Sequence, residues 1–265
     1  MKRLSIKNKK DDMISFKDNE EISDVYPDVR VKTGIKGLDE ILKGGIRKAS
    51  SILVTGSPGS GKTIFALQFL YEGAKRGEPG LYITCEDTIE DIETYAKSLG
   101  LNMEDFESKD LITFIKQPIT TRKLMTISAP LEIIKEKKIK RVVLDSLTFF
   151  EYTHAAGEMD FRKEVLEFIW VMKESGVSLV VTSENPESEM HRYKAEDFLF
   201  EGLINLMMIR RGSSFERCIR VIKMRGQKHL IDIYPFQIKG GGIEIFPEQI
   251  PFSLIGGDER DVKLK

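Results

Sequence analysis

One eight-residue stretch constrains this chain more than any other part of it. Residues 56–63 read GSPGSGKT and fit the pattern G-x-x-x-x-G-K-[ST]. The apolar run 51–55 precedes this stretch, and an apolar, helix-like segment at 63–75 follows it. A strand, a glycine-rich loop and a helix in that order form the setting in which the pattern binds phosphate. The stretch therefore predicts a phosphate-binding loop within an α/β fold.

The residue types of the loop suit a nucleotide triphosphate. Glycines let successive backbone N–H groups point inward around phosphate oxygens, where a side chain would block the approach. The following helix adds the positive end of its dipole. Lys62 is expected to reach the β- and γ-phosphates, and the Thr63 hydroxyl is expected to complete a Mg²⁺ site. ATP and Mg²⁺ are thus the expected ligands, and the predicted binding residues are Gly56, Ser57, Pro58, Gly59, Ser60, Gly61, Lys62 and Thr63.

Strand-like and helix-like segments alternate between residues 51 and 182. Strands are predicted at 51–55, 80–85, 111–115, 141–145 and 177–182, and helices at 63–75, 88–99, 124–137 and around 161–172. This alternation is typical of a mainly parallel sheet covered by helices on both faces. In the last helix, Leu166 is expected on the broad apolar face and Trp170 in the core. The residues Thr88 and Asp91 predict a capping box at the start of helix 88–99.

The pattern changes after residue 203. Four short strand-like runs, at 203–210, 215–224, 230–238 and 242–246, are separated by glycine-containing turns. Such runs indicate antiparallel hairpins, which we expect to extend the parallel sheet. The predicted organisation is a flexible arm at 1–28, one ATPase-type α/β domain at 29–249 and a tail at 250–265.

Composition narrows the function classes. The 41 basic and 42 acidic residues nearly cancel, which argues against a dedicated, strongly basic binder of nucleic acid or membrane surfaces. Only Cys85 and Cys218 are present, outside any CxxC pattern, so neither a disulfide scaffold nor a zinc site is expected. No apolar run is long enough to span a bilayer, and the first residues lack a secretory signal. We therefore expect a cytoplasmic protein without a membrane partner.

Three carboxylates fall at predicted strand ends. Asp145 ends the apolar run RVVLD, and Glu86 and Asp87 follow the strand after the loop helix. Because the carboxyl ends of parallel strands line the ligand crevice, Asp145 is expected to hold Mg²⁺ together with Thr63. Glu86, with a smaller share for Asp87, is expected to activate the water that attacks the γ-phosphate.

With these elements placed, the sequence resembles single-domain KaiC/RadA-type ATPases of the RecA-like superfamily. The matching segments are TGIKGLDEILKGGI at 33–46, the loop GSPGSGKT, TCEDT at 84–88, VVLDS at 142–146, VTSE at 181–184, KMRGQKH at 223–229 and YPFQI at 234–238. The resemblance implies a RecA-like P-loop fold and a homo-oligomeric ring, often a hexamer, with ATP bound between subunits. Asp87 and Gln227 depart from the family pattern, and the single phosphate loop means that the KaiC autophosphorylation cycle and clock function are not implied.

The basic run near the end of the domain is a candidate contact to a neighbouring subunit's ATP. Arg217, Lys223 and Arg225 share parity on one extended segment, so we expect all three to project from one sheet face together with Ile219 and Val221. Lys223 and Arg225 are predicted to act catalytically in trans, as an arginine finger does. Arg217 is predicted to contact the bound nucleotide.

The sequence favours a Mg²⁺-dependent ATPase ring that regulates a partner it does not identify. One alternative is a recombinase paralogue that binds single-stranded DNA through the loop 185–200, where His191, Arg192, Tyr193 and Lys194 combine charge and aromatic stacking. The other is a nucleotide-binding scaffold that does not hydrolyse ATP. Glu184 is a further candidate for sensing the γ-phosphate.

Overall fold

A nine-stranded sheet dominates the computed structural model, which describes residues 29–117, 128–153, 158–185 and 193–255. The predicted arm 1–28 and residues 256–265 of the predicted tail lie outside the described residues. The strands run in the order β11-β10-β9-β8-β3-β7-β6-β4-β5. Their bounds are β3 Ser51–Gly56, β4 Gly80–Thr84, β5 Ile112–Lys116, β6 Arg141–Asp145, β7 Ser178–Glu184, β8 Gly202–Arg211, β9 Ser214–Met224, β10 Ile233–Lys239 and β11 Gly242–Ile245.

The central strands are parallel. Strand β3 pairs in parallel with both β7 and β8, and β6 pairs in parallel with β7 and β4. Every residue of β3 and β4 is buried, as expected for strands covered on both faces. The predicted mainly parallel α/β sheet with flanking helices is therefore confirmed.

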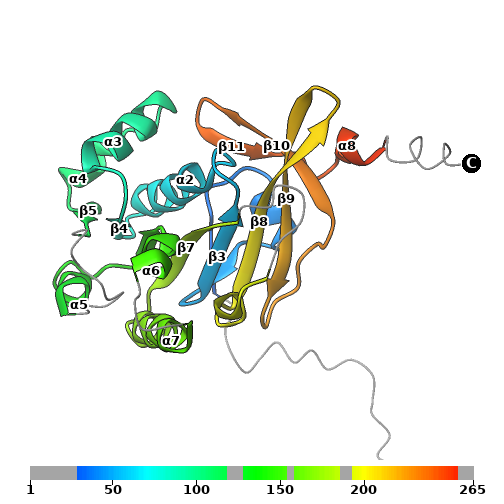
Figure 1. Cartoon of the computed structure of the whole chain (residues 1–265). Helices are drawn as coiled ribbons and strands as arrows, with labels where there is room; N and C mark the ends of the chain where they lie inside the picture. The colour runs from blue at the N-terminus through cyan, green and yellow to red at the C-terminus, as the bar shows by residue number, and fades with distance from the viewer. Residues whose placement is uncertain (1–28, 118–127, 154–157, 186–192, 256–265) are drawn as a thin grey trace, which may run out of the picture.

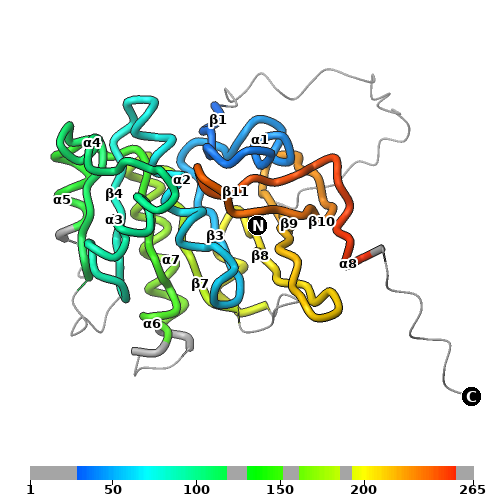
Figure 2. The backbone as a smooth tube through the Cα atoms, turned by 90° about the horizontal axis from the view of Figure 1, so that it is seen from above, coloured from blue at the N-terminus to red at the C-terminus, as the bar shows by residue number. Residues whose placement is uncertain are grey.

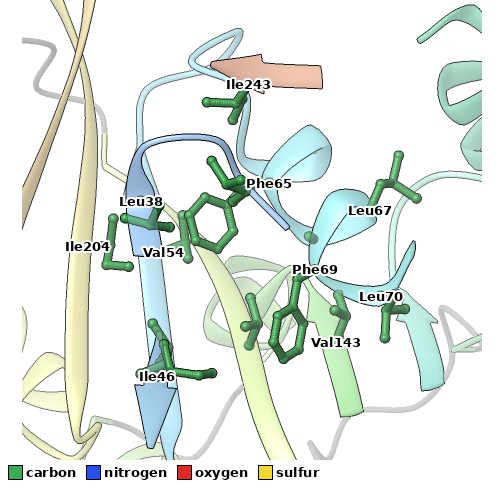
Figure 3. Close-up of a cluster of buried hydrophobic side chains, with 14 of the residues drawn as sticks. Leu38, Ile46, Val54, Phe65, Leu67, Phe69, Leu70, Val143, Ile204 and Ile243 are labelled. Atoms are coloured by element: carbon green, nitrogen blue, oxygen red, sulfur yellow. The ribbon is translucent and has the colours of Figure 1, made fainter. Parts of the chain in front are cut away.

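Helices cover both faces of this sheet (Figure 1). On one face, α2 and α3 share a core with β3, β10 and β11, in which Phe65 of α2 lies beside Val54 and Phe69 lies beside Val143 (Figure 3). On the other face, α5, α6 and α7 pack through residues such as Phe150 and Phe161. The helix bounds are α2 Lys62–Lys75, α3 Ile89–Ser98, α4 Glu104–Glu107, α5 Ser128–Glu136, α6 Leu147–Thr153 and α7 Glu158–Glu174. The predicted capping box of Thr88 and Asp91 opens α3.

The antiparallel hairpins extend the parallel sheet, as predicted. Strand β9 pairs antiparallel with β8, and β10 pairs antiparallel with both β9 and β11. Strand β10 begins at Ile233, three residues after the predicted start. Residues Phe252–Ile255, predicted as part of the tail, form the short helix α8, and Glu216 accepts hydrogen bonds from the backbone N–H groups of Phe252 and Ser253.

The segment before the phosphate loop lies beside the last hairpin (Figure 2). It contains β1 Arg30–Val31, α1 Leu38–Ile41 and β2 Ile46–Arg47. The Ile245 backbone donates to the Lys36 carbonyl at 2.9 Å, and Lys36 forms an ion pair with Glu244. Gln227 donates to the carbonyls of Leu42 and Gly45, both at 3.2 Å. These contacts fix the segment against β11 and against the turn that follows β9.

The expected placement of two α7 residues is wrong. Trp170 is 62% exposed and Leu166 is 51% exposed, although both were assigned to the apolar side of the helix. The buried side of α7 is formed by Phe161, Val165, Phe168, Ile169 and Met172. A helix that lies on one face of a sheet buries only one stripe, and this stripe excludes positions 166 and 170.

The part of the chain that the structure describes holds no helix with the length and apolar content needed to cross a membrane.

Candidate functional site

The predicted phosphate loop lies between β3 and α2. Gly59 and Gly61 have φ angles of 77° and 105°, a backbone region in which a residue with a Cβ atom is strained. Gly61 is also the residue that precedes the first turn of α2. The first N–H groups of a helix have no partner within the helix, so the Lys62 end of α2 offers donors to an anion. The Ser60 hydroxyl is buried without a hydrogen-bond partner in the described structure, which fits a loop shaped around a polar ligand.

Lys62 lies within this loop. Its ammonium group donates to the carbonyls of Gly56 at 2.9 Å and Ser57 at 3.2 Å. Burial lowers the pKa of Lys62, while the charges of Glu184, Asp145 and Glu86 act in the opposite direction. The charges of three carboxylates from three different strand ends therefore act on the Lys62 ammonium. Glu184, a weaker candidate from the sequence, is one of them.

Thr63, the last residue of the loop, is hydrogen-bonded to Asp145. The Thr63 hydroxyl donates to Asp145 Oδ2 at 2.9 Å, although the two residues are far apart in sequence. A hydroxyl and a carboxylate are oxygen donors of the kind that Mg²⁺ prefers. The donor chemistry of this pair thus fits the metal expected from the sequence.

Asp145 also has two hydrogen-bond partners that the sequence analysis did not identify. The Tyr82 hydroxyl donates to Asp145 Oδ2 at 2.6 Å, and the Thr182 hydroxyl donates to Oδ1. A buried tyrosine or threonine in a central strand needs a hydrogen-bond partner for its hydroxyl. The sequence could therefore have indicated that Tyr82 and Thr182 each bind a polar group. Finding the partner required the order β4-β6-β7, which places both hydroxyls on strands adjacent to Asp145.

Glu86 is exposed, and its carboxylate accepts a hydrogen bond from a nearby serine. The hydroxyl of Ser146, which follows Asp145, donates to Glu86 Oε1 at 2.9 Å. Ser146 is buried and was also missed by the sequence analysis. Burial, followed by the carboxylates of Asp145 and Asp91, raises the pKa of Asp87. The charge of Glu86 thus acts on Lys62, and the charge of Asp145 acts on Asp87.

The expectation that Arg217, Lys223 and Arg225 project from one face with Ile219 and Val221 is wrong. Leu203 pairs with Lys223 but Ile204 pairs with Val221, so Ile222 is an extra residue in β9. Such a bulge reverses the alternation of side chains beyond it. Val221 packs in the core of the α2 face, whereas Ile222 packs against the core of the α7 face.

These basic residues also lie at different ends of β9. Arg217 pairs with Met208 near the loop edge, whereas Lys223 lies at the opposite edge, beside the start of β8. At about 3.3 Å per residue, the length of β3 puts that edge on the order of 15 Å from the loop of the same chain. Lys223 Nζ donates to the Asp197 carbonyl and Arg225 donates to the Phe198 carbonyl, both at 2.8 Å. Both carbonyls belong to the short helix η2, Ala195–Phe198.

The loop proposed for single-stranded DNA is described only in part. His191 and Arg192 lie outside the described residues. Tyr193 is 51% exposed, and its ring lies 6.0 Å from that of Phe198. Lys194 forms an ion pair with Glu151 at 2.6 Å, so its charge is partly neutralised within the chain.

The chain is similar to known proteins over most of its length. The family model described as "ATPase: KaiC" matches residues 31–250. A circadian clock oscillator protein KaiC from Parathermosynechococcus lividus is 33% identical over 230 residues, which cover 82% of this chain and 42% of that protein. A UPF0273 protein from Thermotoga maritima is 30% identical over 83% of this chain and 97% of its own length.

A solved structure is similar over the same region. The crystal structure of a KaiC-like protein from the hyperthermophilic archaeon Pyrococcus horikoshii superposes with a TM-score of 0.75 at 32% identity, covering 83% of this chain and 100% of that one. The chain spans less than half of the length of the KaiC relative described above. The family match extends over most of the sequence, and the chain belongs to the KaiC-like ATPase family.

Proposed function

We propose that this protein is a Mg²⁺-dependent ATPase that works in the cytoplasm as a homo-oligomeric ring, such as a hexamer, with ATP bound between subunits. Hydrolysis would change the shape of the ring and so regulate a partner. The observation that carries the proposal is the contact of Thr63 with Asp145 at 2.9 Å directly below the phosphate loop. It brings together the two oxygen donors that a nucleotide-bound Mg²⁺ requires.

The loop would hold the phosphates. The backbone N–H groups of the loop and of the first turn of α2 supply uncharged donors, and Lys62 supplies the positive charge. Lys62 is held by the carbonyls of Gly56 and Ser57, so it is already located at the mouth of the loop. When bound between Thr63 and Asp145, Mg²⁺ would neutralise charge on the β- and γ-phosphates.

Glu86 would hold and deprotonate the attacking water. A general base needs access to that water, and Glu86 is exposed just after the end of β4, where its charge acts on Lys62. The hydrogen bond from Ser146 fixes one carboxylate oxygen, Oε1. The other oxygen, Oε2, is then oriented to accept a proton. A lesser role is proposed for Asp87, because the negative charges of Asp145 and Asp91 act on its carboxylate.

Lys223 and Arg225 would act on the ATP of a neighbouring copy. Their distance from the loop of the same chain argues against a contact within one subunit. A cation from the next subunit would stabilise the charge that develops on the transferred phosphoryl group. Arg217, at the other end of β9, is proposed to contact bound nucleotide.

The substitution Glu86→Gln tests the catalytic assignment. It removes the base but keeps the size of the side chain and a hydrogen-bond acceptor for Ser146. We expect ATP affinity to stay within about twofold and the turnover rate to fall by on the order of 10²-fold or more. Calorimetry gives the affinity, and phosphate release under saturating ATP gives the rate.

The variant Asp87→Asn is the matched control, because it changes the adjacent acid in the same way. Its turnover should fall less than that of Glu86→Gln. Wild-type turnover in Glu86→Gln would contradict the role of Glu86. A wild-type protein that binds Mg²⁺ and ATP tightly but shows no turnover would favour the non-hydrolysing scaffold instead.

A further inference from the structure

Asp145 is surrounded by hydroxyl groups. Thr63, Tyr82 and Thr182 all donate to its carboxylate, two of them to Oδ2 and one to Oδ1. Only Thr63 belongs to the phosphate loop. Tyr82 and Thr182 come from β4 and β7, the two strands that flank the strand of Asp145.

Tyr82 is built into the sheet. It is fully buried, and its ring lies 5.7 Å from that of Phe114. Thr84 pairs directly with Asp145 across β4 and β6, and Tyr82 is two residues earlier on β4, so it shares the face of Asp145. Its hydroxyl therefore reaches Asp145 from the interior of the protein, on the side away from solvent.

Thr63 can keep both of its contacts at once. Its hydroxyl hydrogen donates to Asp145 Oδ2, while a lone pair of the same oxygen is available to the metal in the proposed function. The carboxylate also accepts from Tyr82 on Oδ2 and from Thr182 on Oδ1. These donors, at least one on each carboxylate oxygen, oppose rotation of the carboxylate.

We propose that Tyr82 and Thr182 are positioning residues that hold the Asp145 carboxylate in the orientation that Mg²⁺ requires. Neither residue contacts the nucleotide in this arrangement. They act through Asp145, as partners of metal ligands commonly do, and loss of such a partner typically weakens metal binding by about 10–100-fold. This inference rests on the proposed function, because it assumes that Mg²⁺ binds at Asp145.

The substitution Tyr82→Phe isolates the hydroxyl. The ring and its packing against Phe114 are kept, while Asp145 Oδ2 loses one donor. The quantity to measure is the gain in ATP affinity that Mg²⁺ provides, obtained by calorimetry with ATP in Mg²⁺ and with ATP in EDTA. We expect this gain to fall by about tenfold or more in Tyr82→Phe, with the affinity in EDTA unchanged.

Tyr234→Phe is the matched control. Tyr234 is also buried and also donates to an aspartate, Asp232, at 3.3 Å. It lies near the start of β10, four residues before Ile238, the position that borders Gly61, so its loss should leave the Mg²⁺-dependent gain at the wild-type value. The control separates a specific effect on the metal from the general cost of removing a buried tyrosine hydroxyl.

Thr182 provides an independent test if Tyr82→Phe does not fold. Thr182→Val removes the donor to Oδ1 and should reduce the Mg²⁺-dependent gain, whereas Thr182→Ser keeps a hydroxyl and should retain it. A wild-type gain in both Tyr82→Phe and Thr182→Val would overturn the inference, as would equal losses with and without Mg²⁺. A wild-type protein whose ATP affinity does not respond to Mg²⁺ would overturn the proposed function itself, and the inference with it.

Discussion

At the scale of single residues, the loop depends on backbone shapes that only glycine adopts at low cost. Gly61 has φ 105° and ψ 18° immediately before α2. A Cβ atom there would also lie 3.3 Å from the side chain of Ile238. The conformation of Gly61 thus sets both the direction of the loop and the packing of β10 beside it.

The substitution Gly61→Ala should weaken ATP binding. A non-glycine residue at this conformation costs about 1–3 kcal/mol, so the loop of the variant is expected to relax away from it. ATP binding must then restore the strained loop, and each 1.4 kcal/mol corresponds to about tenfold in affinity. We therefore expect a loss of about fivefold or more, measured by calorimetry. Gly77→Ala is the control, because Gly77 also has a positive φ of 71° but has open space around it. It should lower the unfolding free energy while leaving ATP affinity unchanged, and equal ATP affinities in the two variants would contradict the assignment.

Some residues of the site could be predicted from the sequence and others could not. The phosphate loop is contiguous, so its residues and its strand–loop–helix setting were visible in the sequence. Asp145 and Glu86 were found because strand ends meet at one edge of a parallel sheet. Tyr82, Thr182 and Ser146 were missed because their partner lies on another strand, and only the strand order shows which side chains meet.

At the scale of elements, a buried arginine connects the sheet to its surroundings. Arg141 begins β6 and is fully buried. Its guanidinium donates to Glu78 at 2.7 Å and to the carbonyls of Lys32 and Phe69, both at 2.8 Å. One side chain thus joins β6 to α2 and to the segment that precedes the phosphate loop.

The substitution Arg141→Met should destabilise the fold. It leaves two carbonyls without their donor, and removal of one partner from a buried polar network costs about 3 kcal/mol. Urea denaturation measures this change. Arg76→Met is the control, because Arg76 pairs with Glu72 at the surface, and an exposed pair contributes less than about 1 kcal/mol. Similar costs for the two variants would argue against this role of Arg141.

Two expectations drawn from side-chain periodicity alone, one for β9 and one for α7, were wrong. The parity of Arg217 and Lys223 predicted one shared face, but the extra residue Ile222 separates them. A bulge depends on how two strands pair, and one strand's alternation does not reveal it. In the same way, the apolar content of α7 did not show that Trp170 lies outside the stripe facing the sheet.

At the scale of the whole molecule, the proposed site is divided between two opposite edges of the sheet. Each edge lies on a different side of the subunit, called here the loop face and the opposite face. The loop, Thr63, Asp145 and Glu86 gather at one edge of the sheet, whereas Lys223 and Arg225 lie at the opposite edge. A head-to-tail contact between copies joins two such different faces, and it closes into a ring when the rotation permits. This division is the physical reason to expect activity only in the assembled protein.

Mixing two damaged variants tests this central claim most directly. Glu86→Gln damages the loop face and Arg225→Ala damages the opposite face, so each variant alone should show little turnover. In rings formed by co-expression in equal amounts, about one quarter of the interfaces join an intact loop face to an intact Arg225. We therefore predict recovery of about one quarter of the wild-type ATPase rate. The control mixture of Glu86→Gln with Lys62→Ala should stay inactive, because every interface then contains a damaged loop face. Full activity of Arg225→Ala alone, or no recovery in the mixture beyond the control, would contradict the account.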